Sequence, residues 1–303
     1  MTETLVQSIT KSRKIIAEQK KQLLEIEAEI VYVATGSYEI PMVFPGWTLP
    51  GVLTRQAAKY LYYRDNVPIG NRIVYIHHGV KNDQFLERLK RTADVHALNV
   101  SEIENLACFG DQHVEHVSYQ KVDGSVLDIS KVDAVICASR SLPAIELLQM
   151  AGIKLRKVGV DLYPVITDKH ETSLSNVFAY FNTYNYFEHE VRELKNWVNG
   201  KTVVCACEEV TYGEIEEAIR NRAETMDDIK RITHCGFGAC QWKICRPMVA
   251  EILHSMNIQD PIAYQPKLRF PYTPLTIGKL PSLNDIETSN VDDPLSEAIH
   301  KFF

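Results

Sequence analysis

The chain has 303 residues, a 45% hydrophobic composition and a formal net charge of −6 at pH 7, which is ordinary for a globular protein of two or three domains. A mildly acidic chain without a basic stripe argues against nucleic-acid binding, and no run of 18 apolar residues is present to span a membrane. The N-terminus lacks the apolar core of a secretory signal and the seven cysteines are an odd number, so we expect a reducing compartment. This predicts the cytoplasm, or the inner face of a membrane reached through a partner.

The first part of the chain is predicted to combine strands with one irregular crossing. Residues 12–22 and 26–33 are typical of two strands joined by a polar turn. The segment PMVFPGWTLPGV (41–52) is rich in proline and glycine and cannot form regular structure. Thr54 is suited to cap a helix over residues 55–64.

Compact apolar runs then alternate with helical patterns. The runs at 71–77 and 132–137 are typical of buried parallel strands. The other expected elements are a helix at 82–92, a strand at 94–98, a hairpin of 113–121 and 124–129 that turns at Asp123-Gly124, and a helix at 143–151. This alternation predicts a three-layer α/β domain.

The character of the chain changes after Gly200. A short strand at 202–204 precedes helices that we expect at 211–222, 225–232 and 246–256. The tail from residue 260 is rich in proline, which predicts an extended arm. The chain is therefore predicted to divide into domains at 1–199, 200–258 and 259–303.

Four cysteines form two close pairs, Cys205-Ala-Cys207 and Cys240-Gln-Trp-Lys-Ile-Cys245, separated by 32 residues. Four thiolates brought together by a fold are the ligand set of a [2Fe–2S] cluster or a structural zinc ion. Zinc usually binds Cys-x-x-Cys knuckles, and this spacing departs from that pattern. Simple burial of the cysteines is the third interpretation.

The segment VVCACEEVTYGEIEEAI…IKRITHCGFGACQWKICRPMVAEIL (203–253) resembles the [2Fe–2S] domain of bacterioferritin-associated ferredoxin, the BFD-like type. That family has a Cys-x-Cys pair, a helical spacer and a second close pair after a Gly-x-Gly turn. The resemblance implies that Cys205, Cys207, Cys240 and Cys245 are the cluster ligands. Cys235 lies outside the pattern and is expected to pack nearby.

The rest of the chain resembles the large subunits of heteromeric, dye-linked amino-acid dehydrogenases. This type includes the alpha subunits of proline dehydrogenase and opine oxidase, the corresponding chain of hydrogen cyanide synthase and the large subunit of sarcosine oxidase. The resemblance rests on EIVYVATGSYEIPMVFPGWTLPGVLTRQAA (29–58), VDAVICASRSLPAIELLQMAGIKL (132–155), TSLSNVFAYFN (172–182) and RFPYTPLTIGKL (269–280). It implies an α/β fold that is related to FAD/NAD(P)-binding domains of the disulfide-reductase type.

Three departures from that family concern its dinucleotide sites. The N-terminal strand–GxGxxG–helix that would bind the FAD pyrophosphate is absent before residue 29. The expected glycine loop of the NAD domain has one glycine, Gly79, with His77 and His78 before it and Asp83 after it. Where the family has a Gly-Asp pair for the flavin, this chain has Phe181-Asn182.

These observations predict a degenerate FAD/NAD(P)-binding-like domain followed by a BFD-like [2Fe–2S] domain and a C-terminal arm. We expect a non-catalytic electron-transfer subunit of a hetero-oligomer, in which a flavoprotein partner oxidises an amino acid or a similar small substrate. NAD is not expected, and FAD is expected only if a partner chain shares it. A shared flavin site and a scaffold that carries zinc or a cluster without carrying current are the alternatives.

Overall fold

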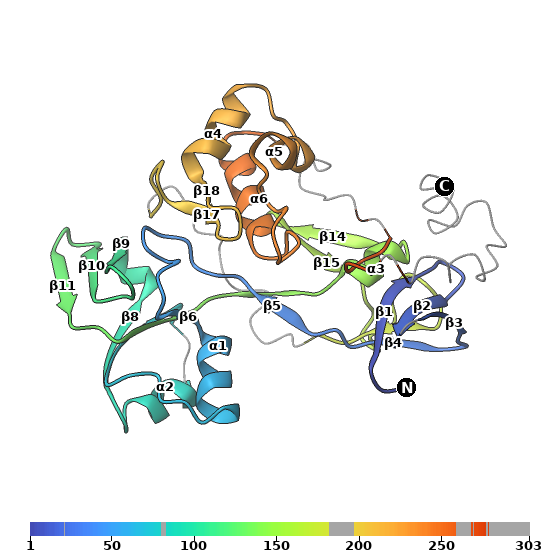
Figure 1. Ribbon diagram of the computed structural model, residues 1–303, viewed down its shortest axis with the longest axis horizontal. Helices are drawn as coiled ribbons and strands as arrows, with labels where there is room; N and C mark the ends of the chain where they lie inside the picture. The colour runs from blue at the N-terminus through green and yellow to red at the C-terminus, as the bar shows by residue number, and fades with distance from the viewer. Residues whose placement is uncertain are drawn as a thin grey trace. The chain divides into compact units, whose positions relative to one another are not determined.

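The computed structural model describes residues 1–20, 22–79, 83–181, 197–258, 268, 270–276 and 278. The chain divides into two compact units (Figure 1). One contains the described residues within 1–37, 143–183 and 266–303, and the other those within 38–142 and 184–265. The chain passes between the units at β5 (Ser37–Glu39) and β13 (Ser141–Pro143).

The first unit is assembled from distant parts of the sequence. Its antiparallel sheet consists of β1 (Thr4–Ile9), β2 (Lys14–Gln19) and β3 (Gln22–Glu27). The predicted strand at 12–22 is therefore wrong in its extent, because Lys20 has a φ of +52° and turns the chain into β3. The remaining elements are the parallel pair β4 (Val31–Val33) and β16 (Val177–Ala179), the hairpin of β14 (Leu155–Val158) and β15 (Asp161–Pro164), and α3 (Glu146–Met150).

A hydrogen-bonded pair joins the two sequence extremes of this unit. The side chain of Gln7 is fully buried. Its Nε2 donates to Thr273 Oγ1 at 2.7 Å, and the Thr273 backbone N–H donates to Gln7 Oε1 at 3.0 Å. Residues near the C-terminal end of the described chain thus complete the unit that the N-terminal sheet begins.

The second unit is built on a parallel sheet with the order β6 (Val52–Thr54), β12 (Ala134–Ala138), β7 (Arg72–His77) and β8 (Asp94–Asn99). The helices α1 (Arg55–Lys59) and α2 (Gln84–Leu89) and the π-helical turn η1 (Tyr60–Arg64) follow β6 and β7. The 3₁₀ turn η2 (Val100–Glu102) leads from β8 to an antiparallel sheet of β9 (Ile103–Phe109), β10 (His116–Lys121) and β11 (Val126–Ser130). The predicted cap is present, since Thr54 Oγ1 accepts from Ala57 N at 3.3 Å.

The two faces of the parallel sheet explain this layering. Side chains alternate along β7, so Ile73 and Tyr75 pack with the helical residues Ala58, Phe85 and Leu89. The opposite face, with Val74 and Ile76, packs against residues of the antiparallel sheet. The predicted three-layer domain therefore forms, with the antiparallel sheet as its third layer.

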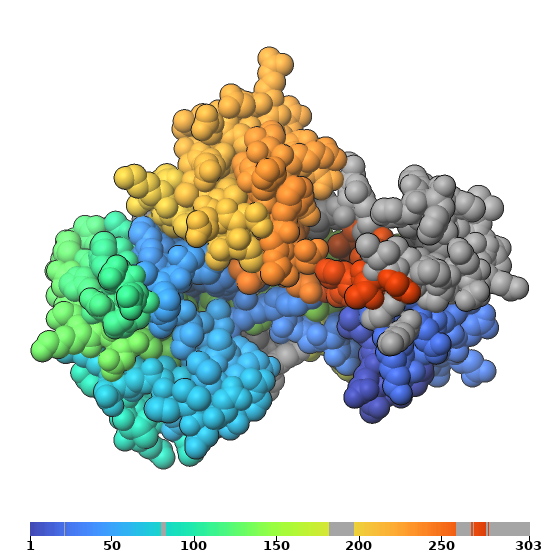
Figure 2. All heavy atoms as spheres, viewed as in Figure 1, coloured from blue at the N-terminus to red at the C-terminus, as the bar shows by residue number. Residues whose placement is uncertain are grey.

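The helical part of the second unit carries the two cysteine pairs and Cys235. It contains β17 (Val203–Cys205), β18 (Val210–Thr211), α4 (Tyr212–Arg220), α5 (Met226–Thr233) and α6 (Cys245–Ser255), which Figure 1 shows as one group of helices beside a short hairpin. Its atoms form a contiguous body in the space-filling view (Figure 2). Within the described residues, no helix is both long and apolar enough to cross a membrane.

Candidate metal centre

The first cysteine pair is positioned by the β17–β18 hairpin. Cys205 is the last residue of β17, is 1% exposed and pairs with Val210 across the hairpin. Cys207 lies in the turn between the two strands and is exposed. One sulfur of the Cys-x-Cys pair therefore faces the helical core and the other lies at its surface.

Two capped helices carry the chain from the first pair to the second. Thr211 and Glu214 form a capping box on α4, and Thr225 and Asp228 form another on α5. The helix α5 ends at His234, which adopts a left-handed conformation with a φ of +63°. This reversal places Cys235 directly after α5 with no exposed surface.

The two glycines before the second pair are required by close packing. A Cβ atom on Gly236 would lie 1.6 Å from the ring of Trp242, and Gly236 has a φ of +86°. A Cβ atom on Gly238 would lie 2.1 Å from Cys207 Cβ and 3.2 Å from its sulfur. Glycine at these positions therefore admits the indole and brings the backbone next to a cysteine of the first pair.

The sulfur atoms gather in two groups. The Sγ atoms of Cys205, Cys235 and Cys245, all buried, lie within 4.8 Å of one another. Cys207 is hydrogen-bonded to the backbone and the side chain of Cys240, which is half-buried. The structure thus brings the predicted cysteines together as Cys205 with Cys245 and Cys207 with Cys240.

Hydrogen bonds among the buried sulfurs favour one thiolate. The side chains of Cys235 and Cys245 and the backbone N–H groups of Gly236 and Glu208 lower the pKa of Cys205 to about 2. The hydrogen bond to Cys205 raises the pKa of both Cys235 and Cys245 far above the ordinary value of a thiol. Deprotonated sulfur that accepts backbone hydrogen bonds is the donor that iron and zinc bind in proteins.

Two aromatic side chains, Phe237 and Trp242, belong to the loop that carries the second cysteine pair. Trp242, which lies between Cys240 and Cys245 in the sequence, is 6% exposed. The Nζ atom of Lys230 lies 5.2 Å from the ring centre of Phe237 and 5.6 Å from that of Trp242. This positive charge is therefore held over the loop that contains the cysteines.

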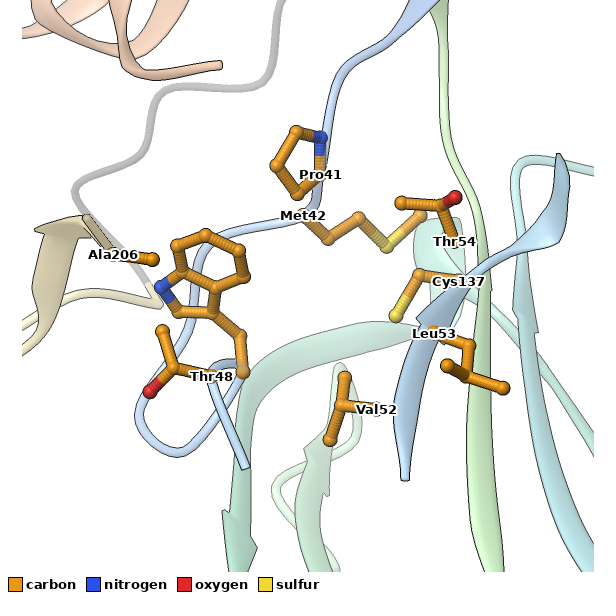
Figure 3. Close-up of a pocket in the computed structure, with 9 residues that line it drawn as sticks. Pro41, Met42, Thr48, Val52, Leu53, Thr54, Cys137 and Ala206 are labelled. Atoms are coloured by element: carbon orange, nitrogen blue, oxygen red, sulfur yellow. The ribbon is translucent and has the colours of Figure 1, made fainter. Parts of the chain in front are cut away.

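A small apolar pocket borders the Cys-x-Cys turn. Figure 3 shows Met42, Val52 and Cys137 facing the hollow, with Ala206 at its far edge. Its volume of about 220 Å³ is below the roughly 300–1,000 Å³ of most cofactor pockets. Trp47, which also lines it, donates from Nε1 to Val203 O at 2.6 Å and so joins the irregular 41–52 segment to β17.

At the end of the segment where a glycine loop is expected from the sequence, Asp83 forms a network with Arg55 and Tyr75. Asp83 is the N-cap of α2 and accepts from the backbone of Phe85 and Leu86 at 3.0 and 3.4 Å. Its carboxylate also accepts from Arg55 Nη2 at 2.7 Å and from the Tyr75 hydroxyl at 2.5 Å. The predicted acid thus fills the helix N-terminus, where a pyrophosphate would need free N–H groups.

Electrostatics hold this network together. Burial alone would raise the pKa of Asp83, but hydrogen bonds from Arg55 and Tyr75 outweigh burial and lower it to about 2. The predicted neighbour His77 accepts from Gly79 N at its Nδ1 atom, at 3.0 Å. Sequence reasoning did not identify Arg55 as the partner of Asp83, since 28 residues separate them and no motif links them.

One residue of the predicted Phe181-Asn182 departure, Asn182, lies outside the described residues. Phe181 is described and packs against the core of the first unit. Cys108 and Cys137, which stand apart from the cysteine pairs in the sequence, are both buried.

Residues 203–255 match the family of BFD-like [2Fe-2S] binding domains. This part of the chain, with its cysteine cluster and helical hairpin, is therefore a small BFD-like [2Fe–2S] domain. The predicted cofactor class is confirmed by this match. The chain as a whole is a mixed α/β protein that carries this domain at residues 203–255.

The relatives agree with the predicted resemblance. One subunit of the opine oxidase of Agrobacterium tumefaciens (strain Ach5) is 22% identical, over 85% of this chain and 70% of its own length. One chain of the hydrogen cyanide synthase of Pseudomonas aeruginosa is 29% identical over 27% of this chain and 18% of its own. The crystal structure of L-proline dehydrogenase from P. horikoshii is similar with a TM-score of 0.70 and 20% identity, over 91% of this chain.

The structural similarity confirms the predicted fold. The chain spans 64% of the length of the proline dehydrogenase chain and 70% of the opine oxidase chain, so it is shorter than both. The predicted α/β scaffold is thus confirmed for most of the chain, and the BFD-like domain is confirmed for residues 203–255.

The cysteine arrangement fits a [2Fe–2S] cluster. Such a cluster takes four thiolates, two on each iron, and the two sulfur groups supply at least two each. Backbone N–H groups already point at Cys205, which is the outer-shell contact that iron–sulfur clusters use. A single zinc ion would use the buried sulfur group but would leave the Cys207–Cys240 contact without a role.

Proposed function

We propose that this chain is the electron-transfer subunit of a heteromeric flavin-dependent dehydrogenase, with Cys205, Cys207, Cys240 and Cys245 as the ligands of a [2Fe–2S] cluster. The observation that carries the proposal is the pairing of these sulfurs by the two ends of one helical hairpin. The boundaries 200–258 for the cluster domain, and 1–199 and 259–303 for its neighbours, are part of the same proposal.

Each proposed ligand has a distinct structural support. Cys205 is fixed by β17 and by the N–H groups of Gly236 and Glu208. Cys245 begins α6 and so lies at the positive end of the helix dipole, which would favour the negative charge of a metal-bound sulfur although the neighbouring cysteines raise the pKa of the unbound thiol. Cys207 and Cys240 contact each other nearer the surface. When bound, the cluster supplies one-electron transfer, and the half-exposed pair gives the path to a partner.

The partner would be a flavoprotein that oxidises an amino acid or a related small molecule, as the names of the relatives suggest. This division of labour is supported by the Arg55–Asp83–Tyr75 network, because that network uses the helix N-terminus that a dinucleotide phosphate would occupy. This chain would hold the cluster, exclude water from it with Trp242 and present it to the acceptor.

The test begins with the complete protein, purified anaerobically with whatever subunits accompany it. We expect near two irons and two sulfides per chain, and a rhombic S = 1/2 EPR signal after dithionite. One zinc per chain and no iron would refute the proposal. Flavin that remains with this chain after its partners are removed would favour the shared-flavin alternative instead.

The Cys240→Ser variant tests the relay in the assembled complex. We expect turnover with an external electron acceptor to be abolished while substrate still reduces the flavin of the partner. Cys108→Ala, which alters a buried cysteine of the α/β core, is the matched control and should keep turnover. Unchanged turnover in Cys240→Ser would show that electrons do not pass through this centre.

A further inference from the structure

The buried group contains one sulfur more than a cluster can use. Each iron of a [2Fe–2S] cluster binds two cysteines, because two bridging sulfides complete its coordination. The Cys207–Cys240 contact supplies one such pair. Cys205, Cys235 and Cys245 lie within 4.8 Å of one another, so one of these three is surplus.

We propose that Cys235 is the surplus residue and that its thiol, which has one proton to donate, gives a hydrogen bond to one of the two neighbouring ligand sulfurs, Cys205 or Cys245, which raises the reduction potential of the cluster. This inference rests on the proposed ligand set. Cys235 would change the reduction potential of the cluster by acting on ligand residues, without being a ligand itself. The Cys-x-Cys and second-pair pattern does not include this residue.

Helix ends distinguish Cys235 from its two neighbours. Cys245 is the first residue of the eleven-residue helix α6, where backbone N–H groups favour a negatively charged sulfur. Cys235 directly follows the C-terminal cap of α5, where free carbonyl groups disfavour negative charge. A negative charge on the sulfur of Cys205 is likewise stabilised by the backbone N–H groups of Gly236 and Glu208.

Burial limits what the Cys235 thiol can bond to. The residue has no exposed surface, and its backbone N–H already donates to Thr233 Oγ1 at 3.1 Å. Its side chain is in hydrogen-bonding contact with both Cys205 and Cys245. A buried donor held between two ligand sulfurs is therefore satisfied only by those sulfurs within the described part of the chain.

The direction of the effect follows from charge. Reduction adds one negative charge to the cluster, and part of this charge lies on the ligand sulfurs. A hydrogen bond to these sulfurs stabilises the reduced state more than the oxidised state, so it raises the potential. Removal of the donor is therefore expected to lower the potential while it leaves the four ligands in place.

The experiment is an EPR-monitored redox titration of the complete protein and its Cys235→Ala and Cys235→Ser variants. We expect all three to hold near two irons per chain. At a fixed potential, the ratio of reduced to oxidised cluster in Cys235→Ala should be up to about tenfold lower than in the wild type. This ratio corresponds to a reduction potential that is lower by about 59 mV for a one-electron couple. Cys235→Ser keeps an O–H donor and should recover most of this loss, and Cys108→Ala should match the wild type.

The outcomes separate this inference from the proposed function. A wild-type protein without a cluster would overturn both. A wild-type cluster whose potential is the same in Cys235→Ala would overturn the inference alone. Loss of iron from both Cys235 variants, with wild-type secondary structure by circular dichroism, would show that Cys235 is a ligand and would also overturn it.

Discussion

Replacement of Asp83 by alanine should destabilise the α/β domain by about 3 kcal/mol. The side chain of Asp83 is 3% exposed, and its loss removes the N-cap of α2, which contributes about 1 kcal/mol. It also leaves the Arg55 guanidinium and the Tyr75 hydroxyl without their carboxylate, at a further cost of about 2–3 kcal/mol. Arg55 is 31% exposed and can recover some hydration, which places this second cost at the low end.

The assay is urea unfolding followed by circular dichroism, with Asp65→Ala as the matched control. Asp65 also accepts two hydrogen bonds from an arginine, Arg64, at 2.8 and 3.0 Å, but this pair is exposed at the surface. We expect no measurable loss for Asp65→Ala. Asp83→Asn keeps the capping oxygen and should fall between wild type and alanine. Equal losses for Asp83→Ala and Asp65→Ala would refute the assignment of Asp83 as a buried structural anchor.

Three further predictions concern pH, the link to β17 and the glycine turn. The pKa of Asp83 is lowered from 3.8 to about 2, so its ionised form stabilises the fold above about pH 4 and this stability is lost as the pH falls towards 2; acid unfolding should be steeper for wild type than for Asp83→Asn. Trp47→Phe removes the 2.6 Å hydrogen bond to Val203 O and should lower the free energy of unfolding by about 1–2 kcal/mol, measured in urea. Gly238→Ala forces a methyl group against Cys207 and should reduce the iron bound per chain by more than half, measured by metal analysis.

Each of these has a clear contrary result. Identical acid unfolding of wild type and Asp83→Asn would mean that the carboxylate is not differentially stabilised in the fold. Trp47→Phe at wild-type stability would mean that the indole hydrogen bond is replaced by water without loss. Full iron content in Gly238→Ala would show that the Cys207 turn tolerates a Cβ atom; Gly278→Ala, with open space around it, is the control.

Local signals in the sequence predicted the helical domain well. Thr211 and Glu214 are close in sequence, and their side chains decide the start of α4 without help from distant residues. The runs that became β7 and β12 contain unbroken apolar stretches, as strands buried on both faces require. This unbroken apolar pattern was therefore equally informative.

Contacts between distant residues were not accessible in the same way. β1 has a mixed polar pattern and was not predicted, because its place depends on pairing with β2 and on the Gln7–Thr273 bonds. Cys235 was expected to pack near the second pair, but its contact with Cys205 of the first pair was not predicted, since it depends on the left-handed turn at His234. A histidine with positive φ leaves only a weak signal in sequence.

The hydrogen bonds between Gln7 and Thr273 affect the order in which the chain can fold. The two residues are 266 positions apart, and the whole BFD-like domain at 203–255 lies between them. A chain emerges from the ribosome N-terminus first, so the cysteine-bearing hairpin is complete before Thr273 is available to close the first unit. Assembly of the cluster site therefore does not have to wait for the unit that contains both Gln7 and Thr273.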